Sequence, residues 1–146
     1  MITGFSYSRP EARRGMSLGP NNAFAFYQHP KYIEPAAKFE RRYDFFSAGI
    51  VLLEVGLWCS MYDFYDNGIL GYPGDENVAE QNRMTLLEKY VPQLGERMGK
   101  IYQDTVAFCL DVEDKVGSLP DDAEGRWVTQ QAFRDNVVDP LARCFA

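Results

Sequence analysis

The longest apolar run in the chain extends over Tyr43–Met61 and has polar side chains at only a few positions. Asp44 stands at its start, Glu54 is the single charged residue in its body, and Gly49 and Gly56 are small. A helix that is apolar on every side has to be covered on every side. We therefore predict a central helix of a mainly α domain, with Asp44 as its N-cap and later helices packed round it.

Weaker periodic patterns follow this run. Asn77, with Glu80 three residues later, predicts a capped helix that continues to about Lys89. Pro92 suits the first turn of the next helix. That helix has one apolar face at three- and four-residue steps, made of Met98, Ile101, Tyr102, Val106, Cys109 and Leu110. We expect this face to contact the core.

The last predicted helix has a single apolar stripe. Its members recur at four-residue steps: Phe133, Val137, Leu141 and Phe145. Pro140 lies inside the stripe, and a proline removes a backbone donor and clashes with the preceding turn. We therefore expect this helix to kink or divide near Pro140.

Three other segments are predicted to be extended or looped. Residues 1–42 form a lead rich in turn residues, in which His29-Pro30 forces an extended backbone. Residues 62–76 form a long loop held by the aromatic clamps Tyr62, Phe64, Tyr65 and Tyr72. Residues 111–124 are acidic and contain Gly117 and Pro120, so we expect an exposed connection. The predicted organisation is one domain, with residues 1–42 as lead and 43–146 as helical region.

Composition and charge restrict the function further. The net charge is −6, with +4 in residues 1–42 and −10 in the remainder, which argues against nucleic acid as a partner. Glu54 interrupts the longest apolar run near its middle, so no membrane span is expected. The N-terminus has no long apolar segment of the kind found in signal peptides, and cytoplasmic surroundings are the default expectation.

Candidate chemistry is sparse. His29 is the single histidine, so a site with two imidazoles is excluded and a packed turn residue is expected. The spacing of the three cysteines matches no metal-binding or redox motif, so we expect them to be small core residues. Gly49 is expected to allow close packing, and Glu54 to find an arginine or a backbone donor. We predict no catalytic, cofactor-binding or metal-binding residues. Ser17, after two arginines, fits a phosphorylation site, but a solvated loop is favoured.

The chain resembles the C-terminal lobe of the protein kinase superfamily. Residues 43–54, YDFFSAGIVLLE, are similar to that family's Y-D-x-[WY]-S-x-G-[VI]-x-L-x-E run, in which Asp44, Gly49 and Glu54 fall in place. Residues 4–9, which include Gly4, Phe5 and Ser6, resemble its D-F-G-L-[AS]-R segment. Residues 29–36 are similar to T-P-x-Y-[IM]-A-P-E, and residues 107–110 resemble the end of a late helix.

The sequence of these segments is especially similar to the degenerate kinase-like domains of fungal proteins that carry an N-terminal HeLo-type (prion-inhibition) domain. The departures from the kinase pattern are marked. Gly4 replaces the metal-binding Asp of D-F-G, and Ala36 replaces the Glu of A-P-E. The glycine-rich loop, the strand Lys and the H-R-D loop have no counterpart in this sequence. The resemblance therefore implies a partial fold that is inactive as the chain stands.

These observations predict a non-catalytic kinase-like module that acts as a scaffold or regulatory interaction domain. One alternative is the C-terminal part of a fuller ATP-dependent Ser/Thr-type kinase, and another is an unrelated helical adaptor. Kinases cover the central helix with an earlier helix and the catalytic loop, which this sequence does not contain. We therefore expect an exposed apolar patch along residues 45–57, open to a protein partner or to the missing half of a kinase domain.

Overall fold

The computed structural model describes residues 22–117, 119–120 and 122–144, and the secondary structure in these ranges is helical, without strands. Two 3-10 helices come first, η2 (Asn22–Tyr27) and η3 (Pro30–Tyr32). The elements that follow are α1 (Tyr43–Leu57), α2 (Met61–Asp66), α3 (Glu76–Thr85), the π segment η4 (Leu86–Tyr90), α4 (Val91–Met98), α5 (Lys100–Leu110), α6 (Val112–Lys115), α7 (Ala123–Phe133), the π segment η5 (Arg134–Val138) and α8 (Asp139–Cys144).

The central helix forms as predicted, but both of its ends differ from the prediction. Arg42 occupies the N-cap position without a side-chain cap, and Asp44 lies in the first turn, so the prediction that Asp44 caps the helix is wrong. A carboxylate there still faces the positive end of the helix dipole. The helix ends at Leu57 and does not reach Met61, because Trp58 takes a left-handed conformation with φ 54° and ψ 41°.

The segment after α1 is more regular than predicted. Ser60 and Asp63 form a capping box that starts α2 inside the stretch predicted to be a loop. Beyond α2, the Asn82 side chain accepts from the Gly71 N–H at 3.0 Å and donates to the Gly71 carbonyl at 2.8 Å. Phe64 is buried, so one of the four predicted aromatic clamps points into the core.

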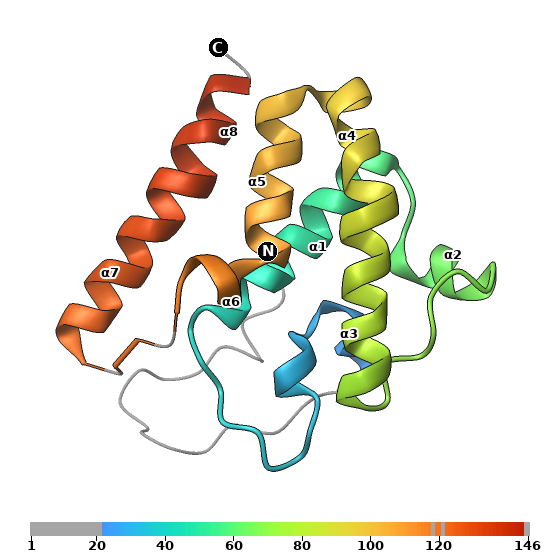
Figure 1. Ribbon diagram of the computed structural model, residues 1–146, viewed down its shortest axis with the longest axis horizontal. Coiled ribbons are helices and arrows are strands. Elements are labelled where there is room, and N and C mark those ends of the chain that lie inside the picture. Colours follow the sequence, from blue (N-terminus) through green and yellow to red (C-terminus); the bar gives the residue numbers. More distant parts are fainter. Residues whose placement is uncertain (1–21, 118, 121, 145–146) are drawn as a thin grey trace, which may run out of the picture.

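The helices α3 and α4 form one rod, and α5 returns beside it (Figure 1). The cap of α3 is Asp75, which accepts from the Val78 N–H, and the predicted box at Asn77 is wrong. Pro92 lies in the first turn of α4, as predicted. The predicted continuation to Leu110 is wrong, because Gly99, with φ 90°, ends α4 and allows α5 to fold back.

The C-terminal helices pack against α5 and the start of α1. Val112 and Val116 are buried against Phe45, so the prediction that residues 111–124 form an exposed connection is wrong in this part. The Phe45 ring also lies 5.0 Å from the Phe133 ring of α7. Pro140 follows the π segment η5, through which α7 continues into α8 without a break (Figure 1).

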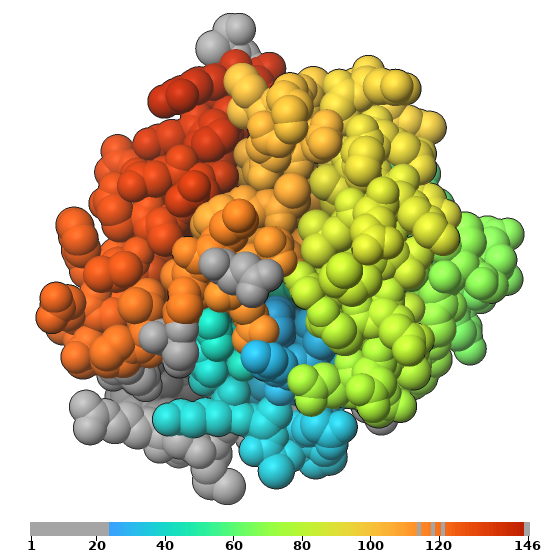
Figure 2. Space-filling model, viewed as in Figure 1, coloured from blue at the N-terminus to red at the C-terminus, as the bar shows by residue number. Residues whose placement is uncertain are grey.

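The core lies between α1 and the later helices. Phe46, Ile50, Leu53 and Leu57 of α1 pack against buried residues of α4 and α5. Figure 2 shows that the later helices cover most of α1 in that view. The mainly α prediction is confirmed, and later helices pack on the central helix as expected. Among the described residues, none of the helices combines the length and apolar character that a membrane crossing requires.

Candidate functional site

The lead segment packs onto the N-terminal end of α1. His29 is buried, and its ring stacks on Tyr43 at 4.5 Å between centroids and meets the edge of Phe46 at 5.3 Å. Its Nδ1 accepts from the Lys31 N–H at 3.2 Å and so caps η3, with Pro30 in the first turn. Burial lowers the pKa of His29 to about 4. The prediction of a packed turn residue is confirmed.

Ion pairs fasten this lead to the acidic segment after α5. Glu113 of α6 lies 2.8 Å from the Lys31 ammonium and 3.2 Å from the Arg42 guanidinium, which also lies 2.7 Å from Glu40. The Arg42 side chain is only 11% exposed, so its charge depends on these carboxylates. Glu113 therefore links segments that are distant in the chain, and the prediction that it belongs to a solvated acidic loop is wrong.

A second tie joins α3 to the end of α5. The Arg83 guanidinium donates to the Leu110 carbonyl at 3.2 Å and to the Asp111 carboxylate at 3.1 Å, and it pairs with Glu80. The carbonyl lies at the last residue of α5, where helical carbonyls lack a partner within the helix. The side-chain hydrogen bond with Glu80 raises the pKa of Arg83 above its ordinary value. Sequence reasoning did not identify this arginine.

Glu54 links three segments. One carboxylate oxygen accepts from the Tyr27 hydroxyl at 2.9 Å and from the Met61 N–H, the first residue of α2, at 2.7 Å. Burial, with the hydrogen bond to Glu54, raises the pKa of Tyr27 to about 12. The expectation that Glu54 finds a backbone donor is confirmed. Tyr27 was not foreseen, because its contact with α1 exists only in the tertiary structure.

Gly49 permits close approach of α5. A Cβ atom at this position would lie 2.6 Å from the Cys109 Cβ and 3.1 Å from a Leu110 methyl carbon. The prediction of a packing reason for Gly49 is confirmed. Gly56 serves in the same way, because a Cβ there would lie 2.5 Å from a Leu94 methyl carbon. The two glycines set the separation between α1 and the α4–α5 hairpin.

The face of α1 away from this hairpin is not covered. Val51 is 48% exposed and Val55 is 50% exposed, and Trp58, just past the helix end, is 90% exposed. Val51 and Val55 are four residues apart and share one side of the helix, and Trp58 follows directly after its last turn. We call these three residues the α1 stripe. The expected apolar patch along residues 45–57 is reduced to Val51 and Val55, because the other large apolar side chains of that range are buried or partly buried.

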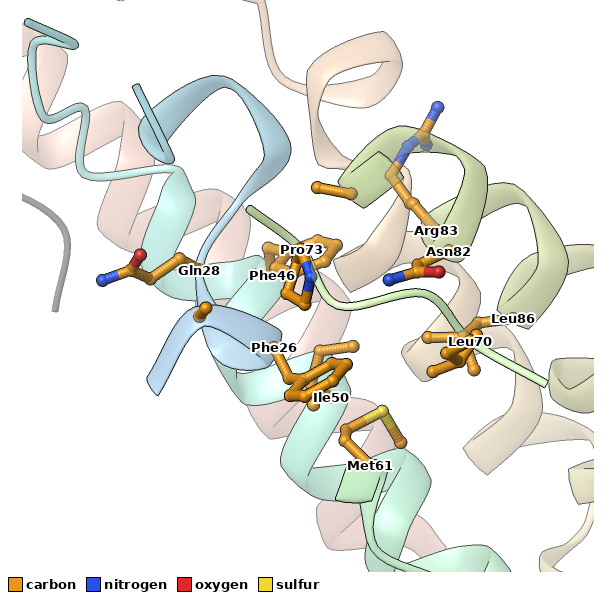
Figure 3. Close-up of a pocket in the computed structure, with 12 residues that line it drawn as sticks. Phe26, Gln28, Phe46, Ile50, Met61, Leu70, Pro73, Asn82, Arg83 and Leu86 are labelled. Atoms are coloured by element: carbon orange, nitrogen blue, oxygen red, sulfur yellow. The ribbon is translucent and has the colours of Figure 1, made fainter. Parts of the chain in front are cut away.

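The pocket in Figure 3, which lies between α1, η2 and α3, is small and largely apolar. Phe26, Ile50 and Met61 form its floor, and Asn82 and Arg83 lie at its far side. It has room for about 10 Å³, close to the space of a single water. Small-molecule sites typically offer roughly 300–1,000 Å³. This hollow therefore cannot hold a nucleotide.

Two cysteines and the histidine have pKa values that favour their neutral forms. Burial raises the pKa of Cys109 to about 12 and also raises the pKa of Cys59. The lowered pKa of His29 leaves its ring uncharged at neutral pH, and the ring is only 3% exposed. Within the described ranges, no group of three or more His, Cys, Asp or Glu side chains is placed to bind a metal ion.

The predicted motif residues meet different outcomes. Gly4, Phe5 and Ser6 lie outside the described residues, as does Ser17. Gly49 and Glu54 lie on α1 but on different sides, since Gly49 faces α5 and Glu54 faces η2 and α2. Trp58 was missed. Its sequence signal is a large aromatic residue directly after a helical apolar run, where glycine is the common residue.

Comparison with known proteins found no matching family model, no matching curated protein and no matching solved structure.

Proposed function

We propose that this chain is a non-catalytic, kinase C-lobe-like module that serves as a scaffold or regulatory domain and binds a protein partner through the α1 stripe. The proposal rests on the resemblance of residues 43–54 to the kinase central helix, and on the exposure of one side of that helix. In kinases the central helix is also covered by an earlier helix and the catalytic loop. Here a protein partner, or the missing half of a kinase domain, would cover the exposed side instead.

The observation that carries the proposal is Trp58. It is 90% exposed and has φ 54°, a conformation that costs a non-glycine residue about 1–2 kcal/mol. Exposed tryptophan also leaves a large apolar surface in water. The left-handed conformation ends α1 within the monomer, whereas the exposed ring contributes nothing to its core. Tryptophan is among the side chains enriched at positions that dominate interface energies. Val51 and Val55 extend the same surface over two helical turns.

The geometry favours an apolar helix as the partner element. The α1 stripe is narrow and apolar, which matches the apolar face of an amphipathic helix. The strip contains no charged side chain. A partner that buries it removes valine and tryptophan surface from water, at roughly 25 cal/mol per Å² before the costs of association.

The experiment places a photo-activatable benzophenone residue at position 55 of the full chain in cells of its source organism. The cross-linked partner is identified by mass spectrometry and purified, and its affinity is measured by titration calorimetry. We expect Val55→Asp and Trp58→Ser each to weaken binding at least tenfold. Ile101→Asp is the matched control, because Ile101 is 45% exposed on α5 and lies outside the stripe.

Two results would overturn the proposal. One is the absence of any partner whose cross-linking depends on position 55. The other is a purified partner that binds Val55→Asp as tightly as the unaltered chain. Phosphate transfer by the purified chain, or a clear rise in melting temperature with ATP and Mg²⁺, would instead favour the fuller-kinase alternative. If a partner binds, but the gene encodes no kinase-like segments upstream and the fold is a simple helical bundle, the unrelated helical adaptor is favoured.

A further inference from the structure

A second exposed surface surrounds α2. Tyr62, Tyr65 and Tyr72, which we call the tyrosine surface, are each between 41% and 46% exposed. Their rings surround the buried Phe26 ring at centroid distances of 5.2, 5.8 and 6.1 Å. Tyr65 and Tyr72 also contact each other at 6.2 Å. Three half-exposed aromatic rings therefore stand together on one buried support.

The backbone beneath the tyrosine surface is held in place. Ser60 and Asp63 close the first turn of α2, and the Asn67 side chain donates to the Asp63 carbonyl at 2.7 Å. The Asn82 amide binds both backbone groups of Gly71, next to Tyr72. A surface that is ordered before it binds loses less conformational entropy on binding. Tyrosine itself presents a large rigid area with few rotatable bonds.

The chain segment that bears the tyrosines carries charge of one sign. Between Arg42 and Arg83 the chain has seven Asp or Glu residues and no Lys, Arg or His. Four of the seven belong to the segment that bears the tyrosines, and all four are exposed: Asp63, Asp66, Asp75 and Glu76. Hydrogen bonds from Ser60 lower the pKa of Asp63, so it stays ionised. Asp66 ends α2, where the helix dipole disfavours a carboxylate.

We propose that the tyrosine surface binds an arginine-rich, extended segment of a protein partner. A guanidinium stacks on an aromatic face and donates two parallel hydrogen bonds to a carboxylate, so arginine suits both parts of this surface. Lysine supplies the charge without the planar stacking. Nucleic acids and anionic membranes are repelled by the same carboxylates. This inference goes beyond the α1 stripe and does not depend on the function proposed for it.

The test uses the full chain and fluorescein-labelled octapeptides of arginine, lysine or glutamine, with binding read by fluorescence anisotropy. We expect the arginine peptide to bind at least fivefold more tightly than the lysine peptide, and the glutamine peptide not to bind. Tyr65→Ser and Asp66→Asn should each weaken arginine-peptide binding at least fivefold. Asp66→Asn removes charge without removing a ring contact, so it remains informative if Tyr65→Ser perturbs the fold.

The matched controls lie on α7, at the opposite end of the molecule from α2 (Figure 1). Trp127→Ser removes an exposed aromatic ring, and Glu124→Gln removes an exposed carboxylate; both should leave binding unchanged. Equal binding of the arginine and lysine peptides that survives Tyr65→Ser would mean attraction by net charge alone, and would overturn the proposal. A dimer that is seen by sedimentation and that Tyr65→Ser dissociates would also overturn the proposal. The tyrosine surface would then bind the basic residues 1–42 of a second copy of the chain.

Discussion

His29 illustrates how a single residue acquires its properties from its surroundings. The sequence identifies it as the one histidine of the chain, and its place before a proline predicts a turn. Its burial against Tyr43 and Phe46, and the lowered pKa that follows, come from the packing of η3 on α1. The charged groups that act on its ring are Glu113, Arg83, Arg42 and Glu80, and desolvation outweighs them all.

This burial predicts a pH dependence of folding stability. The pKa of His29 is about 4 in the fold and 6.5 as an ordinary side chain, so the unfolded chain takes up the proton first as the pH falls. The stabilisation is complete above pH 6.5 and is lost progressively toward pH 4. From pH 7 to pH 5 we expect a loss of about 2 kcal/mol from this residue alone.

Urea unfolding at pH 7 and pH 5 checks this prediction. His29→Asn is the informative variant, because asparagine retains an acceptor for the Lys31 N–H but does not titrate. The difference in free energy of unfolding between the two pH values should be about 2 kcal/mol smaller in the variant. If both proteins lose equal stability between pH 7 and pH 5, the His29 ring is hydrated in the fold and the prediction is wrong.

At the scale of elements, prolines and π segments occur together. Pro92 follows η4 and Pro140 follows η5, each by two residues. Each π segment ends with the N–H of the next helix donating five residues back, from Val91 to Leu86 and from Asp139 to Arg134. This shift accommodates a residue without a backbone N–H, so both rods continue through a proline. The sequence predicts the disturbance, but the continued path depends on packing.

The end of α1 gives a prediction at this scale. Trp58→Gly removes a side chain that is 90% exposed and places glycine at φ 54°, which glycine adopts without strain. We expect the free energy of unfolding to rise by about 1 kcal/mol, which corresponds to roughly 2–4 °C in melting temperature. Thermal unfolding followed by circular dichroism measures the change.

Trp127→Gly provides the comparison, because Trp127 is also exposed but lies within α7. Glycine inside a helix costs about 1 kcal/mol relative to alanine, so this variant should be less stable. Opposite signs for the two tryptophans would show that backbone conformation decides the outcome. A loss of stability in Trp58→Gly would mean that the Trp58 side chain supports the fold of the monomer.

At the scale of the whole molecule, charge pairs join segments that lie far apart in the chain. Lys31 and Arg42 of the lead both pair with Glu113 of α6. We expect Glu113→Ala to lower the free energy of unfolding by roughly 2 kcal/mol, because it leaves the largely buried Arg42 with one carboxylate fewer. Amide hydrogen exchange should become faster in residues 29–45, where the lead packs on α1.

The control for this effect is the pair formed by Lys100 and Asp104 on α5, whose side chains are mostly exposed. Pairs of this kind contribute at most about 1 kcal/mol, so Asp104→Ala should change stability little and leave exchange in residues 29–45 unaltered. If Glu113→Ala and Asp104→Ala are equally mild, Glu113 does not hold the lead in place, and packing of His29 and Tyr43 accounts for its position.

The sequence by itself determined the class of fold and the identity of the central helix. A long apolar run with one charged residue in its body favours a helix that other helices cover on most sides, and Gly49 and Glu54 predict close packing and a hydrogen-bond partner. Local patterns are sufficient here because hydrophobic periodicity acts between near neighbours in the chain. The resemblance to the kinase C-lobe and the three residues at its first motif stay predictions.

Only the tertiary structure decided where the helices end, which charged residues pair across the chain and which apolar surfaces are exposed. The conformation of Trp58, the burial of Val112 and Val116 and the pairing of Lys31 with Glu113 depend on segments distant in sequence. The same is true of the α1 stripe and the tyrosine surface, since Val55 and Tyr65 are apolar or aromatic residues that a core could equally have buried. Which side of a helix meets water is settled by its neighbours, and a single sequence does not specify them.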